Sequence, residues 1–343
     1  MKVLVITSMY PSPEKKYSGI FVKNQFEGVR DNLDDNETIE IFFMKRRITG
    51  LLGSITKHIW AFFRFIPYLF KKYDVIHLHS FFPLIGSAWL YKLFHRKTKF
   101  IVTFHGLDIN QQVHRKNQRL MRFFARKIDY TIPVGREVAR NVEKKLNLPI
   151  GKILPVGVDN ATFYQEKNVS KKYDYIFVGS FFEVKGIDIL YETLKKLDPS
   201  VRFCVVGKGD AYEPIFKSMA EDNNNISLFV DQSHDALRTL YNKSRFLVLP
   251  SRSEGFPTVT IEAMFCGTPV ITSDIPQFKE QVQEGKNGFM FPLDQPEKLL
   301  ELLSNLVSMP TSEYQELVAG ALNSFGHIAL DKVCESLLTI YRE

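Results

Sequence analysis

The sequence predicts an α/β protein with two domains, each built around a doubly wound parallel sheet. The chain has 343 residues, more than one hydrophobic core usually organises, which suits two domains of about 150–190 residues. Short runs of β-branched and aromatic residues alternate with amphipathic segments in both halves, as they do in βαβ units. Runs such as residues 175–178 (YIFV) and 246–249 (FLVL) are apolar throughout, which is typical of parallel strands buried on both faces.

Six segments in each half are predicted as strands, because each is rich in β-branched or aromatic residues and ends near Gly, Ser, His or Pro. In the first half they are residues 2–7, 38–44, 74–79, 99–105, 130–135 and 152–157. In the second half they are residues 173–180, 201–209, 226–230, 244–251, 268–274 and 288–292. A polar stretch at residues 160–172 separates the two series, as a linker does. We therefore expect one domain at residues 1–165, a second at 170–322 and a C-terminal helix within 323–343.

Composition limits the class of protein. Hydrophobic residues make up 45% of the chain and charged residues 24%, which excludes disorder and low-complexity repetition. Cys204, Cys266 and Cys334 form no CxxC pair, which argues against a disulfide framework or a thiolate zinc site and favours a reducing compartment. The first apolar run is too short for a signal peptide, and no apolar stretch reaches the roughly 18 residues that span a bilayer. We expect a cytoplasmic protein without a membrane-spanning segment.

The net charge of +7 hides a difference between the two halves. Residues 1–150 carry 26 Lys and Arg against 12 Asp and Glu, whereas residues 151–343 carry 19 against 26. A basic half attracts nucleic acid, an anionic bilayer surface or phosphorylated substrates, and charge alone does not choose among these partners.

An amphipathic segment in the basic half narrows the choice of partner. Residues 55–73 carry basic residues every seven positions on one face and, on another face at helical spacing, an apolar stripe of Ile55, Ile59, Phe62, Ile66, Leu69 and Tyr73. Such a helix either lies on an anionic membrane or packs on the sheet with its charges in solvent. The basic residues within 115–127 add to the membrane alternative. The aromatic residues follow strand or helix periodicity instead of a nucleic-acid-binding signature, so no nucleic-acid partner is expected.

The candidate site consists of the polar and glycine residues that follow predicted strands, because doubly wound sheets bind ligands at the carboxyl ends of their strands. They are Ser18, Gly19, His105, Asp108, Gly179, Ser180, Lys185, Gly207 and residues 251–257.

The densest signal is the segment 254–262, which reads EGFPTVTIE. Pro257 or Thr258 suits the start of a helix. A strand, a tight loop and a short helix in this order direct backbone N–H groups and the positive end of the helix dipole toward the site, where a diphosphate can bind. Glu254 and Glu262 accept hydrogen bonds when ionised, which suits the vicinal hydroxyls of a sugar or a ribose.

At these residues the sequence resembles the retaining family 4 glycosyltransferases of the GT-B fold, whose mark is two glutamates separated by seven residues. Glu254 and Glu262 have this spacing. Residues 17–25, 105–108, 155–163, 178–188 and 287–289 are also similar to landmarks of the family. The resemblance implies two Rossmann-like domains that face each other across a cleft. It further implies an N-terminal acceptor-side domain, a C-terminal domain that binds the nucleotide sugar, and a last helix that crosses back to the first domain.

The resemblance also implies roles for the donor-side residues. Glu254 would contact the hydroxyls of the transferred sugar, Glu262 the ribose diol and Lys185 the diphosphate. An ammonium group at this place makes physical sense, because it stabilises the charge of the departing nucleotide, and no metal or other cofactor is then required. The donor-binding residues are Gly179, Ser180, Lys185, Gly207, Arg252, Glu254, Gly255, Phe256, Pro257, Thr258 and Glu262.

One donor-side position departs from the family. The family usually has Arg where this chain has Ser180, so a second cation is expected from Lys208 or Arg252, which follow neighbouring strands. Residues 207–212 (GKGDAY) lack the third glycine of a dinucleotide-binding fingerprint. No NAD chemistry is therefore expected.

On the acceptor side, the resemblance places His105 beside the transferred sugar and the diphosphate. The acceptor-side residues are Ser18, Gly19, His105 and Asp108. The predicted catalytic residues are His105, Lys185 and Glu254. His77 and His79 share one face of a strand but lack a third metal ligand nearby, so no metal site is expected.

Together these features predict a retaining hexosyltransferase. It would move a hexose or N-acetylhexosamine from a nucleotide-diphosphate sugar, with UDP favoured over GDP, to a hydroxyl of a lipid-linked or polysaccharide acceptor. The setting would be bacterial surface polysaccharide synthesis, of lipopolysaccharide or capsule, at the inner face of the cell membrane. Three alternatives stay open: a soluble glycosyltransferase with a small acceptor, a nucleotide-sugar epimerase of the same fold, and a non-catalytic membrane-associated binding protein, to which Ser180 points.

Overall fold

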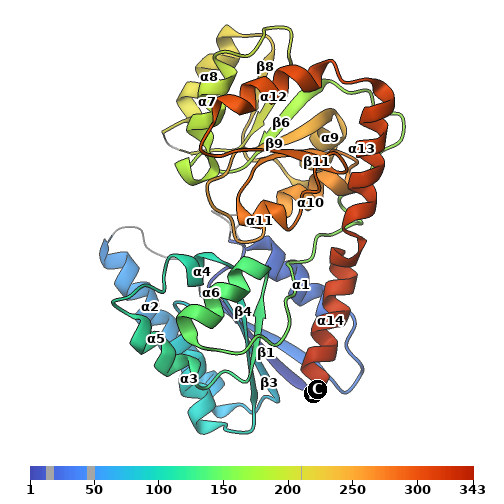
Figure 1. The fold of residues 1–343 in the computed structure, drawn as a ribbon. Helices are drawn as coiled ribbons and strands as arrows, with labels where there is room; N and C mark the ends of the chain where they lie inside the picture. Colours follow the sequence, from blue (N-terminus) through green and yellow to red (C-terminus); the bar gives the residue numbers. More distant parts are fainter. Residues whose placement is uncertain (13–18, 45–50, 210) are drawn as a thin grey trace. The chain divides into compact units, whose positions relative to one another are not determined.

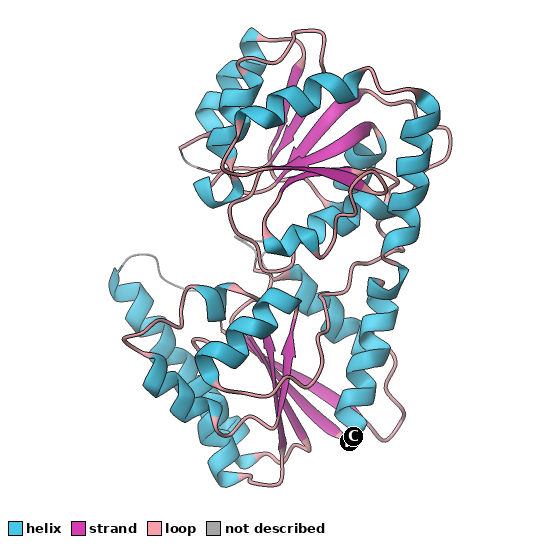
Figure 2. Ribbon diagram, in the orientation of Figure 1, coloured by secondary structure: helices cyan, strands magenta, loops and turns pink. Residues whose placement is uncertain are grey.

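A computed structural model describes residues 1–12, 19–44, 51–209 and 211–343, apart from the side chains of residues 51–57. The chain forms two compact units. Unit 1 contains Met1–Gly157 and Leu330–Glu343, and unit 2 contains Val158–Ala329. Each unit holds one sheet with helices on both of its faces (Figure 1, Figure 2). The predicted fold class, an α/β protein with two doubly wound parallel sheets, is confirmed.

The sheet of unit 1 has five parallel strands in the order β2-β1-β3-β4-β5. The strands are β1 (Lys2–Thr7), β2 (Thr38–Phe43), β3 (Val75–His79), β4 (Lys99–Phe104) and β5 (Tyr130–Pro133). Every residue of β3 is buried. This burial on both faces explains why the strand sequences are apolar over most of their length.

The helices of unit 1 cover both faces of this sheet. They are α1 (Ile20–Arg30), α2 (Leu51–Phe65), the 3-10 helix η1 (Ile66–Phe70), α3 (Ile85–Phe94), α4 (Leu107–Asn110), α5 (Gln118–Ala125), α6 (Arg136–Leu146) and α14 (Leu330–Arg342). The connections from β2 to β3, from β3 to β4 and from β4 to β5 all cross the sheet in the same direction. Because such crossovers are right-handed, their helices α2, α3 and α5 lie on the same face of the sheet.

The C-terminal helix α14 packs against α1 in unit 1. Val29 of α1 and Leu337 of α14 share a buried apolar cluster with the sheet residues Val3 and Ile101. The two helices approach closely at Gly28, where an added Cβ would lie 2.7 Å from the Sγ of Cys334. Unit 1 is thus completed by a segment that lies far from the rest of it in the sequence.

The predicted strand at residues 152–157 is wrong, because the structure forms no regular strand there. The segment runs beside β5: the Lys152 amide donates to the Thr131 carbonyl (3.2 Å) and the Leu154 amide to the Pro133 carbonyl (3.1 Å). Pro133 of β5 has no N–H group to donate back to this segment, so the paired bonds of a regular parallel ladder do not form. The other eleven predicted strands are present, several of them shorter than predicted.

The sheet of unit 2 has six parallel strands in the order β11-β10-β9-β6-β7-β8. The strands are β6 (Tyr173–Val178), β7 (Phe203–Val206), β8 (Ile226–Phe229), β9 (Ser244–Leu249), β10 (Val270–Ser273) and β11 (Gly288–Phe291). The helices are η2 (Glu183–Lys185), α7 (Ile187–Leu194), α8 (Glu213–Asp222), α9 (His234–Asn242), α10 (Thr258–Phe265), α11 (Pro276–Lys279), α12 (Glu297–Val307), α13 (Thr311–Ser324) and η3 (Gly326–Ile328).

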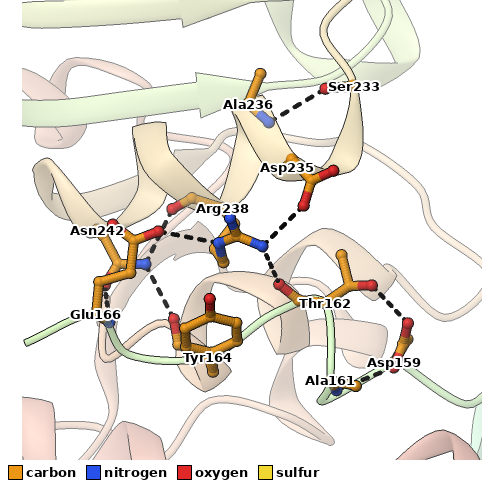
Figure 3. Close-up of polar contacts among 10 residues, drawn as sticks. All are labelled: Asp159, Ala161, Thr162, Tyr164, Glu166, Ser233, Asp235, Ala236, Arg238 and Asn242. Atoms are coloured by element: carbon orange, nitrogen blue, oxygen red, sulfur yellow. Dashed lines mark hydrogen bonds and ion pairs between the residues drawn. The ribbon is translucent and has the colours of Figure 1, made fainter.

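Unit 2 begins before the boundary that we placed at residues 165–170, because the expected linker packs on α9. Figure 3 shows Arg238 of α9 donating to Glu166 (2.9 Å) and to the carbonyl of Thr162 (3.2 Å). Asn242 donates to the carbonyl of Tyr164 (3.0 Å), and Phe163 is buried in the core of the unit. These contacts make the start of the polar stretch a structured part of unit 2.

The second boundary also differs from the expected one at residues 322–323. Unit 2 continues to Ala329, since α13 extends to Ser324 and buries Leu317, Val318 and Ala321 in the core of this unit. Throughout the described part of the chain, no helix combines the length and the apolar character that a membrane span requires.

Candidate active site

The loop between β9 and α10 forms the centre of the candidate site. Strand β9 ends at Leu249, and the chain enters α10 at Thr258 with Pro257 in the N-cap position. No side chain caps this helix start in the structure, and the Thr260 hydroxyl instead donates to the Pro257 carbonyl (2.7 Å). The N–H groups of the first turn of α10 therefore keep the donor capacity that favours an anion.

Lys185 and Glu254 meet at this loop, as the sequence analysis expected of two residues in one site. The Nζ of Lys185 lies 2.8 Å and 2.7 Å from the two carboxylate oxygens of Glu254. The Glu254 side chain is 7% exposed and that of Lys185 is 31% exposed. An anionic ligand can therefore reach the Lys185 ammonium group from solvent, while the Glu254 carboxylate is almost fully buried beside it.

Gly186 explains how Lys185 reaches this position. Gly186 ends η2 and begins α7 with a φ of 67°, a left-handed conformation that glycine adopts at little cost. A Cβ at this residue would lie 1.9 Å from the carbonyl oxygen of Pro250. The tight approach of this turn to the end of β9 brings Lys185 next to Glu254.

Glu262 lies in α10 and is only 9% exposed. The hydroxyl of buried Tyr241 in α9 donates to its carboxylate at 3.3 Å. Burial raises the pKa of Glu262 to about 7, against hydrogen bonds from Thr258 and Tyr241 that favour ionisation. Near pH 7 the carboxyl group is therefore divided between its ionised form, which only accepts hydrogen bonds, and its protonated form, which can also donate one.

Gly179 and Gly207 bring the ends of β6 and β7 together. Gly207 has a φ of 154°, and a Cβ there would lie 1.9 Å from the carbonyl oxygen of Gly179. The Phe181 amide also donates to the Lys208 carbonyl (2.9 Å). The following Ser180 is exposed, so this part of the loop offers backbone groups and one hydroxyl.

Both expected substitutes for the missing arginine are engaged elsewhere in unit 2. The Arg252 guanidinium makes two contacts of 2.6 Å with the carboxylate of Asp188, and these hydrogen bonds lower the pKa of Asp188. Lys208 pairs with Asp231 at 2.6 Å. Arg252 thereby ties the loop after β9 to α7, the helix that follows Lys185, which makes it a positioning residue in this structure.

His105 follows β4 in unit 1, in a loop that Asp108 organises. Asp108 is 1% exposed, and its carboxylate accepts the backbone N–H groups of Phe81, His105, Gly106 and Ile109 at 2.9–3.1 Å. Burial raises the pKa of Asp108 despite these bonds. Asp108 therefore stabilises the loop that carries His105 through these backbone hydrogen bonds.

His79 is a site residue that the sequence analysis considered only as a metal ligand. Its Nδ1 lies 3.3 Å from the Nε2 of His105, and the neighbouring His77 contacts the hydroxyls of Thr103 (2.7 Å) and Tyr341 (2.5 Å). Burial lowers the pKa of His105 and of His77 to about 3 and that of His79 well below its usual value. The three rings are neutral at pH 7, and no cluster of metal-ligating residues occurs among the described residues.

Gly19 caps the start of α1 with a φ of 74°. A Cβ at this residue would lie 2.4 Å from the carbonyl carbon of Met9, so the loop after β1 requires a glycine there. Ser18, the other predicted residue of this loop, lies outside the described residues.

Comparison with known proteins shows which family has this arrangement. Residues 3–161 match the family model described as Glycosyltransferase Family 4, and residues 159–321 match Glycosyl transferases group 1. Over 265 residues the chain is 32% identical to an uncharacterized glycosyltransferase of Methanocaldococcus jannaschii, covering 71% of this chain and 72% of the relative. The chain belongs to the family 4 glycosyltransferases.

Two further comparisons describe the setting and the fold of this glycosyltransferase. It is 25% identical over 325 residues to a putative teichuronic acid biosynthesis glycosyltransferase of Bacillus subtilis, covering 80% of this chain and 81% of the relative. The structure of HepE from Anabaena in complex with UDP and glucose aligns with a TM-score of 0.76 and 16% identity, covering 100% of this chain and 99% of that chain. The glycosyltransferase therefore has the GT-B fold, with relatives in the synthesis of bacterial polysaccharides.

Proposed function

We propose that this glycosyltransferase transfers a hexose or N-acetylhexosamine from a nucleotide-diphosphate sugar, UDP rather than GDP, to an acceptor hydroxyl with retention at the anomeric carbon. The observation that carries the proposal is the contact of Lys185 with Glu254 beside the uncapped start of α10. A cation, a carboxylate and free backbone donors in one loop match the diphosphate and the hydroxyls of such a donor.

Each part of the donor has a proposed partner in unit 2. The diphosphate binds the first N–H groups of α10 and the ammonium of Lys185. Glu254, released from part of its contact with Lys185, accepts hydrogen bonds from the hydroxyls of the transferred sugar. Glu262, which lies about one turn further along α10, accepts those of the ribose diol in its ionised form.

The proposed reaction needs no side-chain nucleophile. The bond from the anomeric carbon to the diphosphate oxygen breaks, and the acceptor oxygen forms its bond to the same face of that carbon. The acceptor proton passes to an oxygen of the departing diphosphate. Lys185 and the α10 amides stabilise the charge that develops on this leaving group. An electrostatic contribution of this kind raises kcat roughly 10²–10³-fold for each hydrogen-bonding group.

We place the acceptor on unit 1, where His105 carries a neutral imidazole. The acceptor class that we favour is a lipid-linked saccharide or growing polysaccharide in the synthesis of a bacterial surface polymer. The teichuronic acid relative supports this setting, and the UDP and glucose held in the HepE complex support the donor class.

A thermal-shift panel of UDP-, GDP-, ADP- and dTDP-sugars tests the donor site. We expect the melting temperature to rise with UDP-sugars, since a ligand at 100 times its Kd adds about 2.7 kcal/mol to the free energy of unfolding. The rise should be lost in Glu262→Ala and reduced in Lys185→Ala. Lys217→Ala, on the exposed side of α8, is the matched control and should keep it.

Turnover assays with the same donors separate catalysis from binding. Lys185→Ala should lower kcat by about 10²–10³, while Lys217→Ala leaves it unchanged. Donor binding without any sugar transfer would support the binding-protein alternative, and interconversion of donors without an acceptor would support the epimerase. A folded chain that shows no shift with any donor would contradict the proposed donor site.

A further inference from the structure

Three segments of unit 1 carry basic residues and no acidic ones. Residues 51–73, 85–97 and 111–128 contain 13 Lys and Arg and no Asp or Glu, although the whole chain has 45 basic against 38 acidic residues. These segments include α2, η1, α3 and α5. Nearly all of the positive excess of the N-terminal half is therefore concentrated in them.

These segments form one continuous layer on one face of the sheet. The hydroxyl of Tyr91 in α3 donates to the carbonyl of Lys71 (3.0 Å), which joins α3 to the end of η1. Trp89 of α3 contacts Phe123 and Phe124 of α5, with ring centroids 5.2 Å and 5.6 Å apart. In Figure 1, α2, α3 and α5 lie on the side of the unit 1 sheet opposite α1 and α14.

The inner side of this layer is packed, but its outer side is apolar and open to solvent. Phe65 of α2 is buried against Phe42, with ring centroids 5.1 Å apart. The exposed apolar side chains of the layer include Trp60 (52% exposed), Phe63 (56%), Phe70 (83%), Phe94 (69%), Leu120 (54%) and Phe123 (47%). An exposed apolar patch of this extent marks an interaction surface.

Residues 55–73 were expected either to lie on a membrane or to pack on the sheet. In the structure some of their apolar side chains pack in the core and others are exposed. Tyr73 is 6% exposed and belongs to the core, whereas Ile59 is 53% and Phe62 is 41% exposed. Residues of the predicted apolar stripe therefore face water, and Ala61 and Phe65 supply the core contact instead.

We propose that this basic aromatic face, residues 58–73, 85–97 and 111–128, binds the surface of an anionic lipid bilayer. Aromatic and aliphatic side chains insert at the level of the lipid headgroups, while Lys and Arg around them attract the anionic phosphates. The inference deepens the proposed function and rests on it for the lipid-linked acceptor, since it names the surface that would bring the enzyme to that acceptor.

Charge and chemistry favour a bilayer over two other occupants. A second copy that met this face with its own would bring two sets of basic side chains together, and like charges repel at an interface, even though Lys71 and Lys92 are paired with Glu40 and Asp129. A nucleic acid would satisfy the charges but would leave six large apolar side chains without an apolar environment. An anionic bilayer satisfies both features at once.

Sedimentation of the full chain with lipid vesicles tests the proposal without any need for turnover. The vesicles contain phosphatidylcholine alone or with 30% phosphatidylglycerol. We expect binding to the anionic vesicles only, weakened when salt is raised from 50 to 500 mM. Arg115→Gln, Arg119→Gln and Arg126→Gln together should weaken the partition constant on the order of 100-fold, about fivefold for each charge.

A second variant tests the apolar part of the face. Trp60→Ser with Phe63→Ser changes only exposed side chains, so the melting temperature should stay near that of the parent chain while vesicle binding weakens at least tenfold. Ile215→Ser with Lys217→Gln removes an exposed apolar and an exposed basic side chain from α8. This matched control should bind vesicles as the parent chain does.

Three results would overturn the proposal. They are equal binding of the parent chain and both variants to anionic vesicles, binding of a short DNA or RNA duplex without vesicle binding, and self-association that the Trp60→Ser and Phe63→Ser changes abolish. Because donor binding is measured separately by thermal shift, loss of the membrane proposal and loss of the proposed enzymatic function give different results.

Discussion

Glu262 is a carboxyl group whose protonation depends on the fold. Its pKa is raised from 4.5 in an open chain to about 7 by burial in α10. As pH rises from 4.5 to 7, the unfolded chain loses this proton while the folded chain keeps it, so the free energy of unfolding falls across this window. Above pH 7 both states are ionised, and the full cost of about 3 kcal/mol is present.

Replacing Glu262 by Gln removes this titration. We predict that the stability of Glu262→Gln relative to the parent chain increases by up to about 3 kcal/mol between pH 5 and pH 8, as measured by urea unfolding at both values. Glu313→Gln removes an exposed carboxylate from the first turn of α13 and is the control for the loss of one negative charge without burial. A Glu262→Gln difference that stays constant would contradict the raised pKa.

At the scale of elements, the turn from η2 to α7 determines where Lys185 lies. We predict that Gly186→Ala lowers the free energy of unfolding by more than about 2 kcal/mol and lowers kcat as well, because the new Cβ strains a left-handed backbone and meets the Pro250 carbonyl. Gly326→Ala is the matched control, since a Cβ there has no neighbour within 4 Å. Equal stability of the two variants would show that the turn adapts.

The elements themselves could largely be predicted from the sequence. Eleven strands were identified because apolar runs and periodicity are local properties of the chain. The strand predicted at residues 152–157 is wrong, because Pro133 of the neighbouring β5 has no N–H group with which to complete the ladder. The fate of the stripe in residues 55–73 depended on tertiary packing, since only the fold decides whether Ala61 and Phe65 or Ile59 and Phe62 face the sheet.

The candidate site could be predicted only where its features are local patterns in the sequence. The spacing from Glu254 to Glu262 is visible in the sequence, and so is the placement of Lys185 after a strand. The ion pair of Arg252 with Asp188 and the contact of His79 with His105 join residues of different elements. No local pattern reports such partners, so their roles emerged only from the structure.

At the scale of the whole molecule, the histidine cluster of unit 1 and Glu262 of unit 2 respond to pH in opposite directions, while Asp108 of unit 1, whose pKa burial also raises, responds as Glu262 does. In unit 1 the pKa values of His77 and His105 are lowered from 6.5 to about 3, and that of His79 is lowered as well. Between pH 6.5 and 3 the unfolded chain binds these protons and the folded unit does not, so the histidines make unit 1 less stable as pH falls. Glu262 in unit 2 has the reverse effect.

Tryptophan fluorescence can follow unit 1 selectively, because both tryptophans of the chain, Trp60 and Trp89, lie in it. We predict that the urea midpoint of the fluorescence transition is lower at pH 5 than at pH 7, because the free energy of unfolding of unit 1 falls by up to about 1.4 kcal/mol per pH unit and histidine below pH 6.5. His79→Asn should reduce this dependence. A midpoint that is unchanged or higher at pH 5 would contradict the depressed pKa values of the histidine cluster.

The helix α14 has a consequence for how the protein is made. Unit 2 is one continuous stretch, whereas unit 1 lacks the partner of α1 until residues 330–343 have left the ribosome. During synthesis the second unit therefore has all of its residues before the first does, which reverses the usual N-to-C order of domain folding. The apolar side of α1 around Val29 stays uncovered throughout that interval, so α1, which is translated long before α14, depends on protection from aggregation until α14 is made.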